Sequence, residues 1–415
     1  MTSLRRINLP SDISKTRSFS VIEPGTDCGT HNPQKLISLY VHWPFCESKC
    51  PYCDFNSHVA DDVDQRVWRR SLLSELEYFG GQTRGRVLQT VFFGGGTPSL
   101  MPTETVAAVL QEVSRHWKVP ENLEVTLEAN PSSSEIKKFL DFRRAGVNRI
   151  SIGVQSFNDN SLIFLRRGHS ANSARSAVLA ALQCFESVSF DLIYALPGMD
   201  ISHWVRELNT ALMLETGHLS LYQLSIEKGT PFYSAHRNGA FTLPDDELAQ
   251  DLYKITNEMM ENAGYCPSEI SNYAKKGREC RHNMIYWQGG DYVGVGPGAH
   301  GRLTLDGVRV RTEQISAPAK WLSAVLSKGH GTRVFEPLAP SEQVDEFLLT
   351  GLRLMRGVDR NAFKKISGKD FEEFFQMNKI EMLISRGLIQ LDAEGLRSTD
   401  IGRLRLNSLI TSLLT

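Results

Sequence analysis

The sequence predicts an α/β protein: an incomplete, TIM-like (β/α)6 barrel followed by a small, mainly helical, winged-helix-like C-terminal domain. Two observations predict the barrel. Six short apolar runs alternate with stretches of helical spacing over residues 36–270, and such alternation is typical of parallel strands joined by right-handed helical crossovers. Polar residues and glycines also follow directly after several of these strands, which is where a (β/α) barrel forms its active site. Six units rather than eight indicate an incomplete barrel.

The predicted strands are rich in β-branched and aromatic residues and are apolar along most of their length, as expected of strands buried on both faces. They are Ile37–His42, Thr90–Phe93, Leu123–Glu128, Arg149–Val154, Val188–Tyr194 and His218–Leu224. The helices between and after them are Val67–Phe79, Val106–Trp117, Ser134–Ala145, Ala171–Phe185, His203–Glu215 and Glu247–Ala263. An open doubly wound sheet would satisfy the same alternation, and the placement of the polar residues favours the barrel.

The pattern divides the chain into four segments. Residues 1–35 form an N-terminal tail, residues 36–270 the partial barrel, and residues 271–334 an irregular connecting segment rich in Gly, Tyr, Asn and His. Residues 335–415 form the C-terminal domain. Its predicted elements are helices at Glu342–Met355, Phe371–Arg386 and Gly402–Leu414, with a hairpin at Leu388–Ser398.

Composition excludes several classes of protein. The 415 residues carry a formal net charge of −1, so the chain lacks the basic excess that is typical of nucleic-acid-binding proteins. No apolar run reaches the ~18 residues that a membrane span needs, which leaves only peripheral membrane contact open. Four basic residues in the first twenty resemble an organelle transit peptide, but Pro10 and Asp12 interrupt any amphipathic helix. We therefore predict a cytoplasmic protein, with the mitochondrial matrix as the alternative.

Three of the seven cysteines, Cys46, Cys50 and Cys53, lie directly after the first predicted strand. Structural disulfides need an oxidising compartment, so such a tight group indicates metal binding instead. The C-x3-C-x2-C spacing puts three thiolates, the usual ligands of iron–sulfur clusters, on one short loop. Three cysteines can hold three irons of a [4Fe–4S] cluster and leave the fourth iron open. A zinc site that also uses His42 and His58 is the alternative, although structural zinc sites usually use two separated pairs of ligands.

The segment that leads into these cysteines, Tyr40–Cys46 with the sequence YVHWPFC, resembles the opening signature of the HemN/HemW branch of the radical S-adenosylmethionine (SAM) superfamily. The resemblance extends from about Leu36 to the C-terminus. It implies that Cys46, Cys50 and Cys53 hold a [4Fe–4S] cluster whose open iron binds the amino and carboxylate groups of SAM.

The ends of the next strands supply the candidate SAM contacts. The glycines of Phe93–Ser99 let the backbone approach a ligand closely, although a plain turn would use the same residues. A carboxylate such as Glu128 at a buried strand end is costly unless it has a partner. Each polar residue alone could be a cap or an ion-pair member. Together they resemble the SAM-contacting positions of the family, which here are Tyr40, Gly95, Gly96, Thr97, Glu128, Gln155, Arg167 and Asp191.

Two functions of different class exist within this branch: a heme chaperone of the HemW type, and an oxygen-independent coproporphyrinogen III dehydrogenase. The dehydrogenases have a further cysteine two positions after the third cluster cysteine, where this chain has Phe55. Residues 282–287 match the HNxxYW motif of HemW proteins. The resemblance therefore favours the chaperone, with heme, a heme-acceptor protein and an electron donor as partners. His282, Tyr286 and Trp287 are the candidate heme contacts, because His can ligate heme iron and aromatic rings can stack on a porphyrin.

Overall fold

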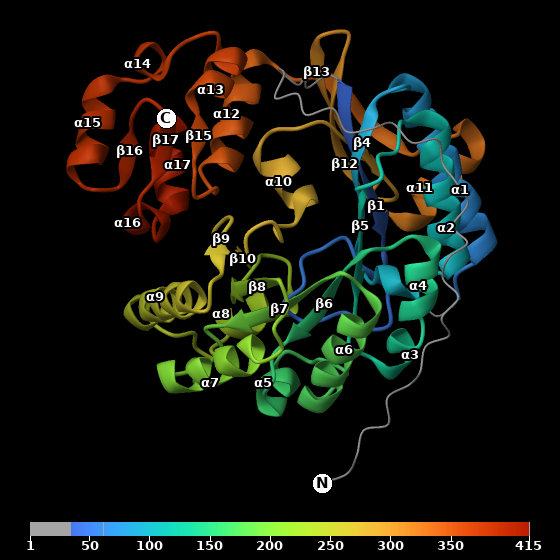
Figure 1. Ribbon diagram of the computed structural model, residues 1–415, viewed down its shortest axis with the longest axis horizontal. Coiled ribbons are helices and arrows are strands. Elements are labelled where there is room, and N and C mark those ends of the chain that lie inside the picture. Colours follow the sequence, from blue (N-terminus) through green and yellow to red (C-terminus); the bar gives the residue numbers. More distant parts are fainter. Residues whose placement is uncertain (1–34, 61, 415) are drawn as a thin grey trace. The chain divides into compact units, whose positions relative to one another are not determined.

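Six parallel strands form the centre of the structure, as the sequence predicts. The computed structural model describes residues 35–60 and 62–414. Within them, six strands lie side by side in chain order (Figure 1). The sheet stays open in the described residues, with β14 (Thr332–Pro337) and β9 (Cys266–Pro267) at its edges, so the prediction of an incomplete barrel is confirmed. The six strands are β1 (Leu36–Trp43), β4 (Val87–Gly95), β5 (Glu124–Ala129), β6 (Arg149–Gln155), β7 (Ser187–Tyr194) and β8 (His218–Gln223).

The two faces of this sheet differ in chemistry. Along β7, Val188, Phe190 and Leu192 pack into the main hydrophobic core. The alternate residues Ser189 and Asp191 line a cavity on the other face, because successive side chains of a strand point to opposite sides. The neighbouring strands add Thr126, Ser151 and Ser220 to the same cavity. The sheet therefore offers one apolar face to the helices and one polar face to a ligand.

Helices connect the strands and cover the apolar face. Most begin at an Asp, Ser, Asn or Thr whose side chain accepts a hydrogen bond from the first turn, as Asp64 does from the backbone of Arg66 and Val67. The helices are α1 (Gln65–Gln82), η2 (Pro98–Leu100), α2 (Thr103–His116), α3 (Ser133–Ile136), α4 (Phe139–Ala145), α5 (Asp159–Phe164), α6 (Ala171–Cys184), α7 (Ile201–Leu212), α8 (Pro231–Arg237) and α9 (Asp246–Asn262).

The single helix expected at Ser134–Ala145 is two helices, α3 and α4. Glu135 on α3 is buried and accepts hydrogen bonds from Ser99 Oγ and from the backbone N–H of Asn130. These bonds tie α3 to the end of β5, and the chain turns at Lys137–Lys138 before α4 begins. A long-range contact of this kind leaves no trace in helical periodicity.

Residues 271–334 differ most from the sequence prediction, because they are regular rather than irregular. They extend both sides of the sheet: β11 pairs parallel with β1, and antiparallel strands follow it. On the far side, β10 pairs antiparallel with β8 and β9. The elements are β10 (Asn272–Ala274), α10 (Arg281–Trp287), β11 (Tyr292–Val295), β12 (His300–Leu305), β13 (Val308–Gln314) and α11 (Pro318–Lys328), with β14 after them.

Close strand approach explains why this segment looked like a loop in the sequence. A Cβ added to Gly294 on β11 would lie 2.0 Å from the carbonyl oxygen of His300, and one added to Gly301 on β12 would lie 3.0 Å from that of Tyr292. Glycine is needed at both positions so that the two backbones can meet. The Gly-rich composition therefore marks a tight pair of strands here and not an irregular connection.

The C-terminal residues form a second hydrophobic core of their own, and the prediction of a mainly helical domain is confirmed. The predicted hairpin is β16 with β17, and β15 pairs beside β17. The helix expected at Phe371–Arg386 is interrupted because Phe375 takes an extended conformation. The elements are α12 (Pro340–Gly351), β15 (Val358–Asp359), α13 (Arg360–Ser367), α14 (Phe371–Phe374), α15 (Met377–Ser385), β16 (Ile389–Leu391), β17 (Gly395–Ser398), α16 (Asp400–Arg403) and α17 (Leu406–Leu414).

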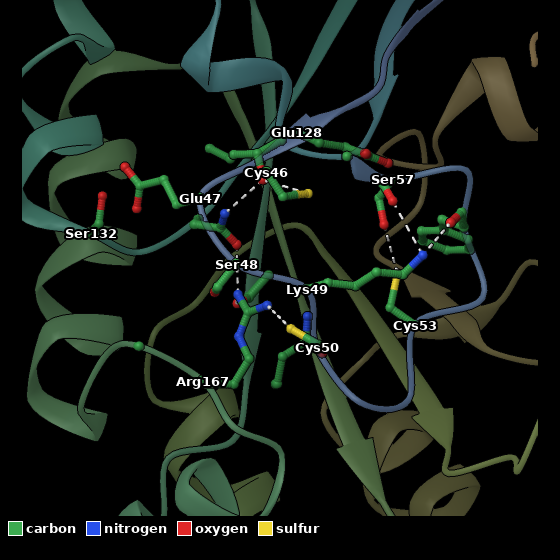
Figure 2. A pocket seen from close by; sticks show the side chains of 18 of the residues that line it. Cys46, Glu47, Ser48, Lys49, Cys50, Cys53, Ser57, Glu128, Ser132 and Arg167 are labelled. Atoms are coloured by element: carbon green, nitrogen blue, oxygen red, sulfur yellow. Dashed lines mark hydrogen bonds between the residues drawn. The ribbon is translucent and has the colours of Figure 1, made fainter. Parts of the chain in front are cut away.

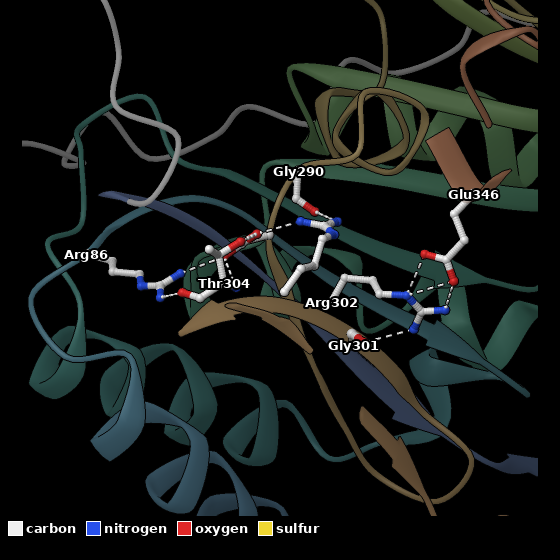
Figure 3. Close-up of polar contacts among 8 residues, drawn as sticks. Arg86, Gly290, Gly301, Arg302, Thr304 and Glu346 are labelled. Atoms are coloured by element: carbon white, nitrogen blue, oxygen red, sulfur yellow. Dashed lines mark hydrogen bonds and ion pairs between the residues drawn. The ribbon is translucent and has the colours of Figure 1, made fainter. Parts of the chain in front are cut away.

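Ion pairs join the extended sheet to this helical part. Arg302 on β12 donates to both carboxylate oxygens of Glu346 on α12 (Figure 3). Within the sheet, the buried Asp291 accepts hydrogen bonds from the backbone N–H of Thr304 on β12, from Arg86 directly before β4 and from Arg309 on β13. A bidentate guanidinium–carboxylate pair fixes orientation as well as distance.

The predicted tail of residues 1–35 lies outside the described residues except for Lys35, and the four-part division of the chain stays a prediction. Among the described helices, none has both the length and the apolar character required to cross a membrane.

Candidate functional site

The cysteine loop follows β1 and folds back on itself. Cys46 lies in β2 (Phe45–Cys46), which pairs with β3 (His58–Val59) on the return path. Between them, the backbone N–H of Cys53 donates to the carbonyl of Cys50 at 3.2 Å. Lys49 Nζ donates to the carbonyl of Ser57 at 3.2 Å. These bonds close the loop, so its three thiols are held on one short, ordered segment.

The three thiols line one cavity together with residues from the strand ends (Figure 2). We call it the thiol cavity. Thr97 Oγ1 donates to Cys46 Sγ at 3.4 Å, and Arg167 Nη1 donates to Cys50 Sγ at 3.3 Å. Cys53 Sγ lies 3.7 Å from Ser57 Oγ. Hydroxyl and guanidinium donors stabilise the negative charge of thiolates, which is the form that binds metal.

The donor set fits an iron–sulfur cluster better than a single zinc ion. Among residues 35–60 and 62–414, no group of three or more His, Cys, Asp or Glu side chains converges on a position for one metal ion. His42 and His58, the further zinc ligands considered above, both turn towards Asn56: His42 Nε2 donates to its carbonyl at 2.9 Å, and His58 Nε2 lies 3.0 Å from its Oδ1. Three thiols spread around one cavity match a cluster, whose irons each take a separate thiolate.

The glycine segment after β4 lies against the cysteine loop. The backbone N–H of Gly96 donates to the carbonyl of Trp43 at 2.7 Å, and that of Thr97 to the carbonyl of Phe45 at 2.8 Å. A Cβ on Gly96 would lie 2.8 Å from the latter oxygen, so only glycine fits there. Gly95 has a φ of +117°, which also favours glycine. The glycines therefore let the backbone of this segment lie against the cysteine loop, close to the thiols.

Two half-buried carboxyl groups face the thiol cavity from β5 and β7. Burial, together with the nearby charge of Asp191, raises the pKa of Glu128 to about 8, although the backbone N–H of Gly95 donates to Glu128 at 3.2 Å. Burial likewise raises the pKa of Asp191 to about 6. Two carboxyl groups that line one cavity favour a positively charged or hydrogen-bond-donating ligand, because neither has an ion-pair partner among residues 35–60 and 62–414.

Arg167 and Gln155 also line the thiol cavity. Arg167 Nη2 donates to Asn130 Oδ1 at 2.6 Å and to the carbonyl of Gly153 at 2.8 Å. Gln155 has a φ of +68°, unusual for a residue other than glycine, at a register shift between β6 and β7. Strained backbone of this kind concentrates at binding sites. The conformation directs the end of β6 into the cavity.

The sequence analysis missed Asn130. Its side chain accepts from Arg167 and donates to Thr97 Oγ1 at 3.1 Å, so it links the partners of two thiols. The sequence feature that pointed to Asn130 was its position just after the third predicted strand. Tyr40, by contrast, is an expected SAM contact that does not line the thiol cavity. Its hydroxyl donates to His42 Nδ1 at 3.0 Å, and its ring lines two adjoining cavities.

The HNxxYW segment forms the short helix α10, which lies against β4 (Figure 1). Glu124 accepts hydrogen bonds from the backbone N–H groups of Arg281 and His282, which fixes the start of the helix. His282 is buried, and both ring nitrogens have partners: Nδ1 lies 2.6 Å from Thr90 Oγ1 and Nε2 lies 2.7 Å from Tyr286 Oη. Burial lowers the pKa of His282 to about 3, so the ring is neutral.

The three motif residues do not share one surface. His282 and Tyr286 line the same inner cavity, whereas Trp287 lies under the guanidinium of Arg353, 4.8 Å from its ring centroid. Arg353 also pairs with the buried Glu269 at 3.0 Å. Trp287 is thus part of the contact between α10 and the helical C-terminal part.

Comparisons with known proteins agree with this geometry. Residues 40–211 match the radical SAM superfamily, and residues 338–405 match the HemN C-terminal domain. The chain is 40% identical to radical S-adenosyl methionine domain-containing protein 1, mitochondrial, of Bos taurus, over 91% of this chain and 87% of that protein. It is 37% identical to the heme chaperone HemW of Escherichia coli, over 90% of this chain and 97% of that protein. The structure of coproporphyrinogen III oxidase (HemN) from Escherichia coli has the same fold, with a TM-score of 0.76 at 20% identity, over 92% and 90% of the two chains.

Proposed function

This chain belongs to the HemW family of the radical SAM superfamily, and from that premise we propose that it is a heme chaperone. It binds a [4Fe–4S] cluster, SAM and heme, and it transfers heme to an acceptor protein. The observation that carries the proposal is that the thiol cavity adjoins a second cavity with aromatic walls. The two share Phe55, Gly95 and Glu128 in their linings.

Cys46, Cys50 and Cys53 hold the cluster in this proposal. The cluster supplies one-electron chemistry and an iron with an open coordination position when it is bound. Thr97 and Arg167 donate hydrogen bonds to two of the thiols, and donors of this kind raise the reduction potential of a cluster. The external electron donor would have to approach the exposed side of the loop, where Phe55 is 63% exposed.

The strand ends hold SAM. The Gly95–Gly96 backbone lies close enough to the cysteine loop to contact the methionine part of SAM, and Glu128 and Asp191 offer carboxylates to the N–H groups of its amino nitrogen and to its ribose hydroxyl groups. Gln155 supplies an amide that can donate or accept. Glu128 is protonated below about pH 8, and the positive charge of the SAM sulfonium would lower the pKa of Glu128 on binding.

The alternative function is that of an oxygen-independent coproporphyrinogen III dehydrogenase, which oxidatively decarboxylates two propionates. The 20% identity to the HemN structure supports the shared fold only. Phe55 stands where the dehydrogenases have a further cysteine, and α10 carries the HNxxYW motif, which favours the chaperone.

A reducing compartment suits both the free thiols and the cluster. Cytoplasm is our sequence-based expectation and the mitochondrial matrix is the alternative, which the word "mitochondrial" in the vertebrate relatives' names supports. Attaching residues 1–34 to a fluorescent protein tests this point: import into mitochondria establishes the matrix, and diffuse fluorescence establishes the cytoplasm.

An anaerobic assay of the reconstituted protein separates the two functions. The protein is incubated with SAM, a reductant and coproporphyrinogen III, and the same preparation is titrated with heme. Stoichiometric heme uptake without protoporphyrinogen formation, followed by loss of heme to an apo-acceptor, supports the chaperone. Turnover of coproporphyrinogen III overturns it in favour of the dehydrogenase.

A further inference from the structure

The second cavity, beside the thiol cavity, lies at the junction of the cysteine loop, α10 and the β11–β12 turn. We call it the aromatic cavity. Its volume is about 460 Å³, within the range of about 300–1,000 Å³ that is usual for sites of small molecules and cofactors. Tyr40, Tyr286, Tyr292 and Phe55 contribute rings to its wall, and His42 and His300 contribute imidazoles. Aromatic rings and imidazoles in one wall suit a flat, apolar ligand whose metal takes a nitrogen ligand.

The histidines near this cavity differ in whether a ring nitrogen is free. His42 donates from Nε2 to the carbonyl of Asn56 and accepts at Nδ1 from Tyr40. His282, in the motif helix, has both nitrogens engaged by Thr90 and Tyr286. An iron could bind either ring only after a buried hydrogen bond had broken, which would leave a buried polar group without its partner.

His300 is the exception. It is exposed at the mouth of the aromatic cavity, and its ring has no hydrogen-bond partner among residues 35–60 and 62–414. A neutral imidazole with an available lone pair is the form that ligates heme iron.

The backbone that carries His300 is held firmly. Asn56 Nδ2 donates to the carbonyl of Pro297 at 2.8 Å, and Glu75 accepts from the backbone N–H of Gly296 at 2.7 Å. The turn from Gly296 to Gly298 is thereby tied both to the cysteine loop and to α1. The fixed backbone keeps His300 at the mouth of the cavity, and its unengaged ring can turn either nitrogen towards a ligand.

We propose that His300 is the axial ligand of the heme iron and that heme binds in the aromatic cavity with Tyr286 in its wall. His282 is then a positioning residue, which holds the Tyr286 hydroxyl at 2.7 Å, and not an iron ligand. The inference rests on the proposed function, since it names the ligand and the place of the heme that the chaperone would carry. It also gives the HNxxYW motif a role: the motif shapes the cavity and does not supply the iron ligand.

The test is a heme titration of the full-length protein and three variants under identical conditions: His300→Ala, His282→Ala and His236→Ala. His236 is an exposed histidine on α8, away from all three cavities, and serves as the matched control. Circular dichroism checks that each variant is folded. The Soret absorbance reports affinity, and electron paramagnetic resonance of the ferric state reports the iron ligand.

His300→Ala should lose the histidine-ligated spectrum and bind heme roughly tenfold more weakly or worse, and added imidazole should restore the spectrum. His282→Ala should bind more weakly but keep that spectrum. A fourth variant, His300→Cys, should replace it with the signature of a thiolate-ligated heme, which a role in folding alone would not produce. An unchanged spectrum in His300→Ala, with loss of the signal in His282→Ala, would assign the iron to His282 and overturn the inference. If the unaltered protein binds no heme, the proposed function itself is wrong.

Discussion

Glu75 gives the sharpest quantitative prediction. This carboxylate on α1 is fully buried and accepts hydrogen bonds from the backbone N–H of Gly296 at 2.7 Å, from that of Gly331 at 2.6 Å and from Trp321 Nε1 at 3.0 Å. Burial nevertheless outweighs these three donors and raises the pKa of Glu75 from 4.5 to about 7. Glu75 therefore holds the turn before His300 through its bond from Gly296. It also binds a proton more tightly in the folded chain than in the unfolded chain.

The sign of the pH dependence follows from this difference. When the folded state binds more protons, the free energy of unfolding falls as pH rises through the interval between the two pKa values. For Glu75 the interval runs from 4.5 to about 7. At about 1.4 kcal/mol for each pH unit, the contribution lost across it is about 3 kcal/mol.

Glu75→Gln removes the titration but keeps one oxygen acceptor. Its amide group faces one of the three N–H donors, so we expect the variant to be about 1–3 kcal/mol less stable than the unaltered protein near pH 5. The deficit should shrink or reverse above about pH 7, where the unaltered protein carries the full cost of a buried charge. Urea unfolding of the apo-protein at several pH values between about 5 and 8 measures both curves.

Glu77→Gln is the matched control, because Glu77 is exposed on the same helix. Its stability should follow that of the unaltered protein at every pH. A difference between Glu75→Gln and the unaltered protein that stays constant from about pH 5 to about pH 8 would refute the reasoning, since it would mean that Glu75 does not titrate in that interval.

Three further predictions concern the site and its support. Cys46→Ser should lose the visible absorbance and the iron of the reconstituted cluster. Cys184→Ser, altered at the end of α6, should keep both. Equal iron contents in the two variants would contradict the assignment of Cys46 as a cluster ligand. Glu128→Gln should weaken SAM binding about 10- to 100-fold in calorimetry. The affinity of the unaltered protein should rise with pH towards the pKa of Glu128, about 8, because the carboxylate form accepts hydrogen bonds from the amino group of SAM. A pH-independent affinity in the unaltered protein would count against that pairing. Arg353→Met should lower the free energy of unfolding by about 2–4 kcal/mol, because it leaves the buried Glu269 without its ion-pair partner. Adding Glu269→Gln to this variant should recover part of the lost stability. If it recovers none, the loss does not come from the broken ion pair.

The sequence predicted what depends on local pattern. Apolar runs with helical stretches between them gave the six strands, because burial on both faces demands continuous apolar side chains. The polar residues after these strands were correctly expected to meet, since the carboxyl ends of neighbouring parallel strands lie at one edge of the sheet. In the structure the three thiols, Glu128, Gln155, Arg167 and Asp191 line one cavity.

Only the tertiary structure decided what depends on long-range contact. Gly294 and Gly301 looked like loop residues because glycine serves both loops and close strand pairs, and only the β11–β12 pairing distinguishes the two. The HNxxYW motif suggested His282 as an iron ligand by residue type. Thr90, which lies 192 positions away in the chain, engages its Nδ1, and no pattern local to the motif reveals that bond. His300 carried no signal of its own, because the availability of a ring nitrogen is set by what surrounds the side chain after folding.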